Sequence, residues 1–119
     1  MDYDVSTALR NQIIDDLLVM EDELNNPSFH WNGDNYGFIP SISEFDRELE
    51  TGGFSTNQML TATVRKLDSS YNSIFAPYPT AQDKIIYNMD GSEFRIESIK
   101  HDATGAYFRM VGVSTVRGI

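Results

Sequence analysis

The sequence predicts a mainly β protein: a small β-barrel or sandwich with an N-terminal amphipathic helix and two long loops. The clearest signal is in the last third of the chain, where the β-prone segments 83–100 and 106–113 are separated by turn residues at 102–105. Within the first segment, Phe94 and Ile96 alternate with charged residues, as in a strand with one buried face. This β-meander holds no set of residues that could run a reaction, so we expect a domain that works by contact and assembly.

The first 26 residues are expected to form a helix and residues 27–119 a β-barrel or sandwich, within a single domain overall. Apolar residues recur at three- and four-residue steps between positions 4 and 24, which indicates one apolar helix face. That face consists of Val5, Leu9, Ile13, Leu17, Met20 and Leu24, widened by Ile14 and Leu18. The run Asn-Asn-Pro at 25–27 ends the helix, because the residue before a proline avoids the α conformation.

A hairpin, a long strand and two loops are predicted between the helix and the meander. Asn32-Gly33 between aromatic, β-prone runs is a strong hairpin signal. Alternating apolar residues predict the longest strand at 54–67. Residues 41–53 lack a clean period and are expected to form a long mobile loop, with a short helix possible at 44–49. Residues 68–82 form the second predicted loop, whose apolar side chains should pack on its own barrel or on a neighbour.

Finer features of the meander are also predicted. Ile99 breaks the alternation, and a bulge near Ser98 would restore it. Gly91 and Gly105 should supply the positive φ of tight turns. The β-prone tail 114–119 could add to a neighbouring sheet edge.

Negative charge is concentrated near the N-terminus. The chain carries a net charge of −9, and residues 1–50 hold 12 acids against two bases, a net charge of about −10. Three of these acids, Glu21, Asp22 and Glu23, lie where the helix dipole disfavours them, which predicts a cation nearby in the assembled state. Binding DNA through its phosphates needs clustered Lys and Arg and is not expected. The acidic half is either a solvated face, a surface for a basic partner, or a surface that repels nucleic acid.

Few residues are candidates for chemistry, and no enzyme, cofactor or metal site is predicted. His30 and His101 have no metal-ligand spacing and no adjacent nucleophile, so both are interpreted as structural. Adjacent acids such as Asp15-Asp16 splay around a helix instead of converging on a cleft. Three aromatic residues could stack on bases, but core packing is favoured because no Lys or Arg is interleaved with them. They are Trp31, Tyr36 and Phe38.

Compartment and membrane signals are weak. The absence of cysteine excludes disulfides and thiolate metal sites, and favours the cytoplasm slightly. The acidic start is not expected to be a signal peptide, because it has no apolar core. No stretch approaches the roughly 18 apolar residues of a membrane span, so no membrane partner is expected.

Three stretches of the β-domain, taken in order, carry a resemblance to a known family. They are residues 29–41 (FHWNGDNYGFIPS), residues 52–54 leading to LTATVRK at 60–66, and the end of the meander at 104–110 with RGI at 117–119. Together they resemble the small neck proteins of tailed bacteriophages, the head-closure or head–tail joining group that includes the tail-attachment protein of lambda-like phages. The resemblance covers roughly residues 28–119 and brings no catalytic residue. The long acidic helix departs from the family pattern.

The resemblance implies a structural virion protein that is assembled in the bacterial host cytoplasm and located in the phage neck. Copies would form a six-fold or twelve-fold ring beneath the portal, closing the DNA-filled head and joining it to the tail. The expected partners are the chain itself, a portal-side adaptor, and a tail-side neck or terminator protein, while DNA passes through without specific binding. We also hypothesise that acids of the helix or of residues 44–50 line the channel, because an acidic wall repels phosphates.

Residues expected to contact partners or neighbouring copies lie in the two loops, at the start of the strand at 54–67, and in the tail. They are Glu44, Phe45, Asp46, Glu48, Glu50, Phe54, Tyr71, Ile74, Phe75, Tyr78, Arg117 and Ile119. Two other functions fit the same sequence. One is a tail-terminator or adaptor ring of the same machine. The other is a binding module with an OB-like fold for single-stranded nucleic acid or a peptide.

Overall fold

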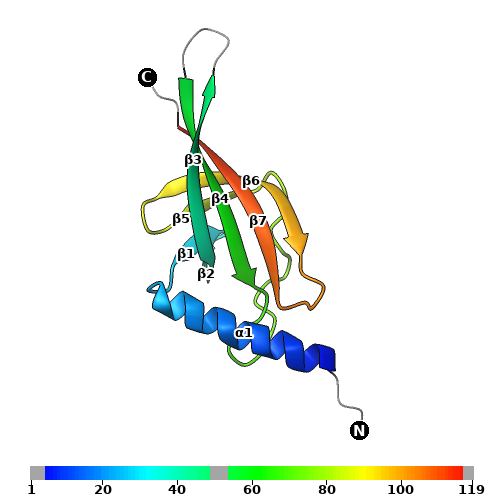
Figure 1. The fold of residues 1–119 in the computed structure, drawn as a ribbon. Coiled ribbons are helices and arrows are strands. Elements are labelled where there is room, and N and C mark those ends of the chain that lie inside the picture. The colour runs from blue at the N-terminus through cyan, green and yellow to red at the C-terminus, as the bar shows by residue number, and fades with distance from the viewer. Residues whose placement is uncertain (1–4, 49–53, 117–119) are drawn as a thin grey trace.

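The computed structural model describes residues 5–48 and 54–116, which contain one helix and seven strands. These elements are α1 (Val5–Glu23), β1 (Ser28–Trp31), β2 (Asp34–Gly37), β3 (Ile39–Glu48), β4 (Phe54–Arg65), β5 (Lys84–Tyr87), β6 (Ser92–His101) and β7 (Tyr107–Val116). The strands form one antiparallel sheet in the order β2-β1-β5-β6-β7-β4-β3, which curls into a half-barrel (Figure 1). The expected fold class, mainly β with an N-terminal helix and a barrel-like sheet, is confirmed.

The predicted hairpin connects β1 to β2. Trp31 pairs with Asp34, so the connection has only two residues, Asn32 and Gly33. Their φ angles of 51° and 87° are the left-handed values that a two-residue type I′ turn requires at both positions. The local sequence therefore specifies this turn without help from the rest of the fold.

Strands β5, β6 and β7 form the predicted meander, with positive φ at Gly91 and Gly105 in its two turns. The pairing of β6 with β7 shifts register between Ile96 and Ser98, which confirms the bulge. Because side chains alternate between the two faces of a strand, the extra residue returns Ile99 to the core side, where it packs on the buried cluster.

The prediction of a mobile loop at 41–53, with a helix at 44–49, is wrong. Residues Ile39–Glu48 form strand β3, which pairs with β4 in an unbroken antiparallel register from Ile39–Thr63 to Glu48–Phe54. Ser, Glu and Asp have low intrinsic strand preference, and here the main-chain pairing with β4 overrides it. Residues 49–53 lie outside the described part of the chain.

The C-terminal tail is also more engaged than expected. Strand β7 continues to Val116, which pairs with Thr56 of β4, so 114–116 already belong to the sheet of their own chain. On the other side the register with β6 stops at the Arg95–Val113 pair, so the addition of 114–116 to a neighbouring sheet edge stays a prediction, and 117–119 lie outside the described residues. Strands β3 and β4, with the end of β7, project beyond the curled part of the sheet (Figure 1), and the molecule measures 66 × 25 × 24 Å.

Helix α1 lies across one end of the half-barrel, and the asparagines after it have positive φ, 63° at Asn25 and 53° at Asn26. The helix ends as predicted, since the Asn26 N–H donates back to the Glu21 carbonyl at 2.7 Å. The predicted buried face is wrong in part. The buried side centres on Ile14, Leu17 and Glu21, whereas three residues of the predicted face are about half exposed. These are Leu9, Met20 and Leu24.

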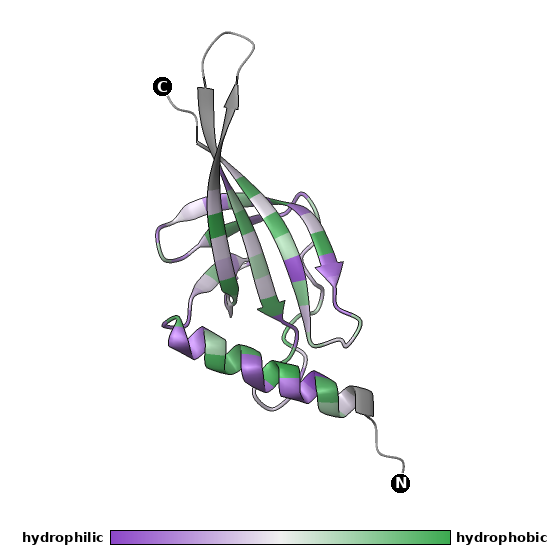
Figure 2. Cartoon of the chain, in the orientation of Figure 1, coloured by the Kyte–Doolittle hydropathy of each residue, from purple (hydrophilic) through white to green (hydrophobic). Residues whose placement is uncertain are grey.

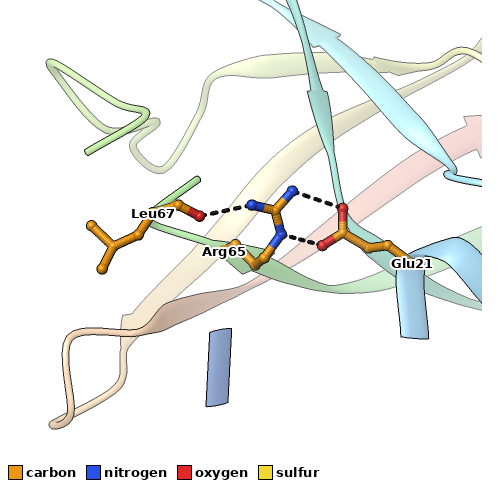
Figure 3. Close-up of polar contacts among 3 residues, drawn as sticks. All are labelled: Glu21, Arg65 and Leu67. Carbon is orange, nitrogen blue, oxygen red and sulfur yellow. Dashed lines mark hydrogen bonds and ion pairs between the residues drawn. The ribbon is translucent and has the colours of Figure 1, made fainter. Parts of the chain in front are cut away.

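Burial of Glu21 explains why the buried side of α1 differs from the predicted one. Its carboxylate forms a two-pronged ion pair with the Arg65 guanidinium at the end of β4, with Arg65 Nη2 donating to Oε1 at 3.2 Å (Figure 3). Arg65 also donates to the Leu67 carbonyl at 2.7 Å. The carboxylate lies so close to Gly37 that a Cβ there would collide with it. The cation expected near the acidic helix end is therefore present, but it belongs to the same chain and not to an assembled partner.

The main core fills the inside of the curl. Its fully buried side chains come from strands on both halves of the sheet and from Phe38 between β2 and β3: Phe29, Phe38, Leu60, Ala62, Val64, Ile85, Phe94, Ile96, Phe108 and Met110. Ile14 of α1 forms a smaller cluster with Leu67 and Ala106, so the helix is attached to the barrel by one apolar contact region and one ion pair.

We predict that Arg65→Met lowers the free energy of unfolding by about 3–5 kcal/mol, because it leaves the Glu21 carboxylate buried without a counterion. The double variant Glu21→Gln/Arg65→Met should lose less than the two single variants together. Urea denaturation of all four proteins measures this coupling. Arg95→Met is the matched control, since its ion pair with Glu97 is exposed, and it should cost at most about 1 kcal/mol. An equally small cost for Arg65→Met would contradict the anchoring role.

Candidate interaction surfaces

The long loop after β4 packs on its own barrel, one of the two possibilities that the sequence left open. Phe75 is only 4% exposed, and its ring stacks on Tyr36 with centroids 4.5 Å apart. It also meets Phe108 edge-on at 5.4 Å, so it bridges strands that are not neighbours in the sheet. Ile74 and Tyr78 are half-buried against the same core. Most of the apolar surface of this loop is therefore used within the chain.

Polar contacts fix the first part of that loop. The Asp68 carboxylate accepts the N–H groups of Ser70 and Asn72 at 2.8 and 3.0 Å. Tyr71, with a φ of 63°, donates its hydroxyl to Asp15 of α1 at 2.9 Å. This hydrogen bond to a carboxylate raises the pKa of Tyr71, since it stabilises the protonated phenol. Tyr71 thus links the loop to the helix, a role that sequence spacing alone did not indicate.

The projecting ribbon of β3 and β4 carries most of the other expected contact residues. By backbone register, Glu44 lies opposite Gln58, Asp46 opposite Thr56, and Glu48 opposite Phe54. Phe45 lies on the same ribbon, opposite Asn57. Within the described residues β3 is an edge of the sheet. The structure thus places Glu44, Phe45, Asp46 and Glu48, which were predicted in a loop, on the same ribbon as Phe54. Glu50, Arg117 and Ile119 lie outside the described chain.

An apolar side of α1 remains uncovered, and sequence analysis missed its neighbour. Leu24 is 50% exposed and, together with Met89 from the β5–β6 turn, lines a hollow of about 410 Å³. Met89 is 81% exposed. Met20 lies one turn earlier on the same helix side. This combination could not be read from the sequence, because the two segments are more than 60 positions apart.

A second hollow, about 320 Å³ in volume, lies at the end of β6 and the start of β7. It is lined by Lys100, His101, Asp102, Ala103, Tyr107 and Arg109. Burial, and then the nearby Lys66 ammonium, lower the pKa of His101. The carboxyl of Asp102 accepts hydrogen bonds from the Thr104 hydroxyl and N–H, which lower its pKa.

Both histidines contact side chains of neighbouring elements. His101 packs edge-on against Tyr78 at 5.2 Å and beside Phe108 at 5.6 Å. His30 Nδ1 lies 3.0 Å from Asn35 Oδ1 across the hairpin. Among residues 5–48 and 54–116 there is no cluster of three or more His, Asp or Glu side chains suited to hold a metal ion. In the same part of the chain, no helix has the length and apolar character needed to cross a membrane.

Comparison with protein-family models and with curated proteins gives no match for this chain. The candidate surfaces are therefore interpreted from their own geometry and charge.

We predict that Phe75→Ala lowers the free energy of unfolding by about 3–5 kcal/mol, since it opens a cavity in the aromatic core. Val19→Ala is the control, because Val19 is 57% exposed on α1 and its truncation should change stability by no more than about 0.5 kcal/mol. Urea denaturation of both variants provides the measurement. A near-neutral Phe75→Ala variant would mean that the loop does not contribute to the core in solution.

Proposed function

We propose that this chain is a structural protein of the tailed-phage neck. In this proposal its copies form a ring beneath the portal or its adaptor, close the DNA-filled head and join it to the tail. The observation that carries the proposal is the β3–β4 ribbon, which projects from the curled sheet and presents a long unpaired edge (Figure 1).

A free strand edge favours assembly because its main-chain N–H and C=O groups can pair with a strand of another protein. Strand β3 is such an edge strand within the described chain, although Pro40, its second residue, offers no N–H. Acids occupy alternate positions at 44, 46 and 48. Charges on an edge strand discourage unselective pairing, so the ribbon suits a joint that pairs with one matching partner.

The distribution of charge supports passage of DNA without binding. The acids of residues 1–50 give that segment a net charge of about −10. A duplex is itself densely negative, so a channel lined by carboxylates lets it slide. On this proposal the protein is located in the virion neck and is assembled in the bacterial host cytoplasm. Its partners are other copies in a six-fold or twelve-fold ring, a portal-side adaptor, and a tail-side neck or terminator protein.

Two alternatives use the same surfaces. A tail-terminator or adaptor ring would also need a projecting edge, and only the position in the particle separates it from a head-closure ring. A binding module for peptides could use β3 to add a strand. The base-stacking alternative is less supported, because Phe38 is buried and Trp31 and Tyr36 pack against the core.

We predict that phage lacking this gene produce DNA-filled or leaking heads beside separate, complete tails. Electron microscopy of the lysate is the measurement, and the gene supplied in trans should restore joined particles. Complete heads beside defective tails would move the protein to the tail-terminator position. Intact infectious particles would exclude a neck role and favour the binding-module alternative.

We further predict that joined particles carrying Glu44, Asp46, Glu48 and Glu50 all changed to Lys eject DNA more slowly, because a basic wall would retain the phosphates. Time-resolved DNA release from purified particles gives the rate. Changing Asp34 and Asp90, which are turn-region acids outside the ribbon, to Lys serves as the control. Unchanged ejection in the ribbon variant would show that these acids do not line the channel.

A further inference from the structure

Two pairs of basic residues lie directly opposite each other on the exposed face of the meander. Lys84 pairs in register with Arg95, and Lys100 pairs with Arg109. Like charges in directly opposed positions destabilise a sheet unless something compensates for them. In the first pair the compensation is internal: Lys84 lies 3.4 Å from Glu93, and Arg95 lies 3.5 Å from Glu97.

The second pair has no such compensation in the described part of the chain. No ion pair joins an acid there to Lys100 or Arg109. Asp102 also lines the hollow, and it keeps its negative charge because its hydrogen-bond donor, Thr104, is neutral. Arg109 lies over the Tyr107 ring, with its guanidinium carbon 5.6 Å from the ring centroid. Two cations, Lys100 and Arg109, against one carboxylate leave the hollow at the end of β6 and the start of β7 with an excess of positive charge.

The C-terminal half of α1 has the complementary surface. Asp16, Met20, Glu23 and Leu24 follow one another at four-, three- and one-residue steps along one side of the helix, and all four are exposed. Asp16 accepts a hydrogen bond from the neutral Gln12 amide at 3.1 Å, so its charge remains. Figure 2 shows hydrophobic and hydrophilic residues interspersed along this part of the helix, and hydrophilic colour at the end of β6 and the adjoining part of β7.

The middle of α1 packs on the β6–β7 turn through Ile14 and Ala106, whereas the C-terminal end of α1 lies on the opposite side of the fold from this turn (Figure 1). Contact between two different surfaces on opposite sides joins copies head to tail, and such contacts close into a ring when the rotation between copies permits. We propose that the basic hollow between β6 and β7 of one copy binds the acidic, apolar side of α1 of a second copy. This inference rests on the proposed ring function and names the interface that builds the ring.

The test is a charge exchange between the two surfaces. The hollow variant is Lys100→Glu/Arg109→Glu, and the helix variant is Asp16→Lys/Glu23→Lys. Each variant alone places like charges at every contact, so its self-association should be weaker than that of the wild type by more than about tenfold. An equimolar mixture of the two variants restores opposite charges at both kinds of contact and should recover assemblies of the wild-type size. Sedimentation velocity over a concentration series up to about 1 mM measures the association.

The matched control is Lys84→Glu/Arg95→Glu, which changes the net charge as the hollow variant does but at the compensated pair. It should associate like the wild type, and circular dichroism should show that all variants are folded. The inference is overturned if the wild type stays monomeric throughout the series, if neither surface variant weakens association, or if the control weakens it equally. A ring that forms through another surface would contradict this interface but not the proposed neck function. Infectious particles produced without the gene would contradict the neck function but not an interface measured by sedimentation.

Discussion

The hydrogen-bond ladders on both sides of β4 hold together parts of the molecule with different roles. On one side β4 pairs with β7, and on the other side with β3, each over ten residue positions. The central part of β4 contributes Leu60, Ala62 and Val64 to the core. Its start continues into the projecting ribbon, and its end supplies Arg65, which anchors α1 through Glu21. Core, arm and helix are thus placed relative to one another by a single strand, so the candidate surfaces keep fixed positions on the fold.

Local signals in the sequence were sufficient to predict the turns and the meander, because the residues that determine these features lie within a few positions of one another. Asn32-Gly33 adopts the left-handed conformations that its hairpin needs, and the broken alternation at Ile99 correctly indicated a bulge. Strand β3 could not be found in this way, because its order comes from pairing with β4 and not from its own residues. The helix dipole predicted a cation near Glu21, but the sequence could not show that this cation is Arg65, which lies 44 positions further along the chain and makes the burial of Glu21 favourable.

The candidate surfaces were likewise predictable from the sequence only in part. The sequence contained the excess of acids near the N-terminus and the apolar residues of the loop, but it did not show where either lies. Phe75 was expected at a contact surface, whereas the fold places it inside the barrel. As separate positions in the sequence, Lys100 and Arg109 do not indicate a binding surface. Their significance depends on the register between β6 and β7, which brings them opposite each other without an acid in between.

The bulge at Glu97 determines which side chains of β6 face the core. Before it, the core side of the strand is occupied by Phe94 and Ile96; after it, by Ile99 and His101, opposite the buried Met110 and Phe108. If the full-length β6 paired without the bulge, Lys100 would fall in phase with Ile96 and point towards the apolar interior, and Ile99 would face outwards. Deleting Glu97 would instead place Ile99 two residues after Ile96, so a regular strand would keep the same side chains on the core side. The bulge is thus the adjustment by which β6 accommodates one extra residue without exchanging its inner and outer faces.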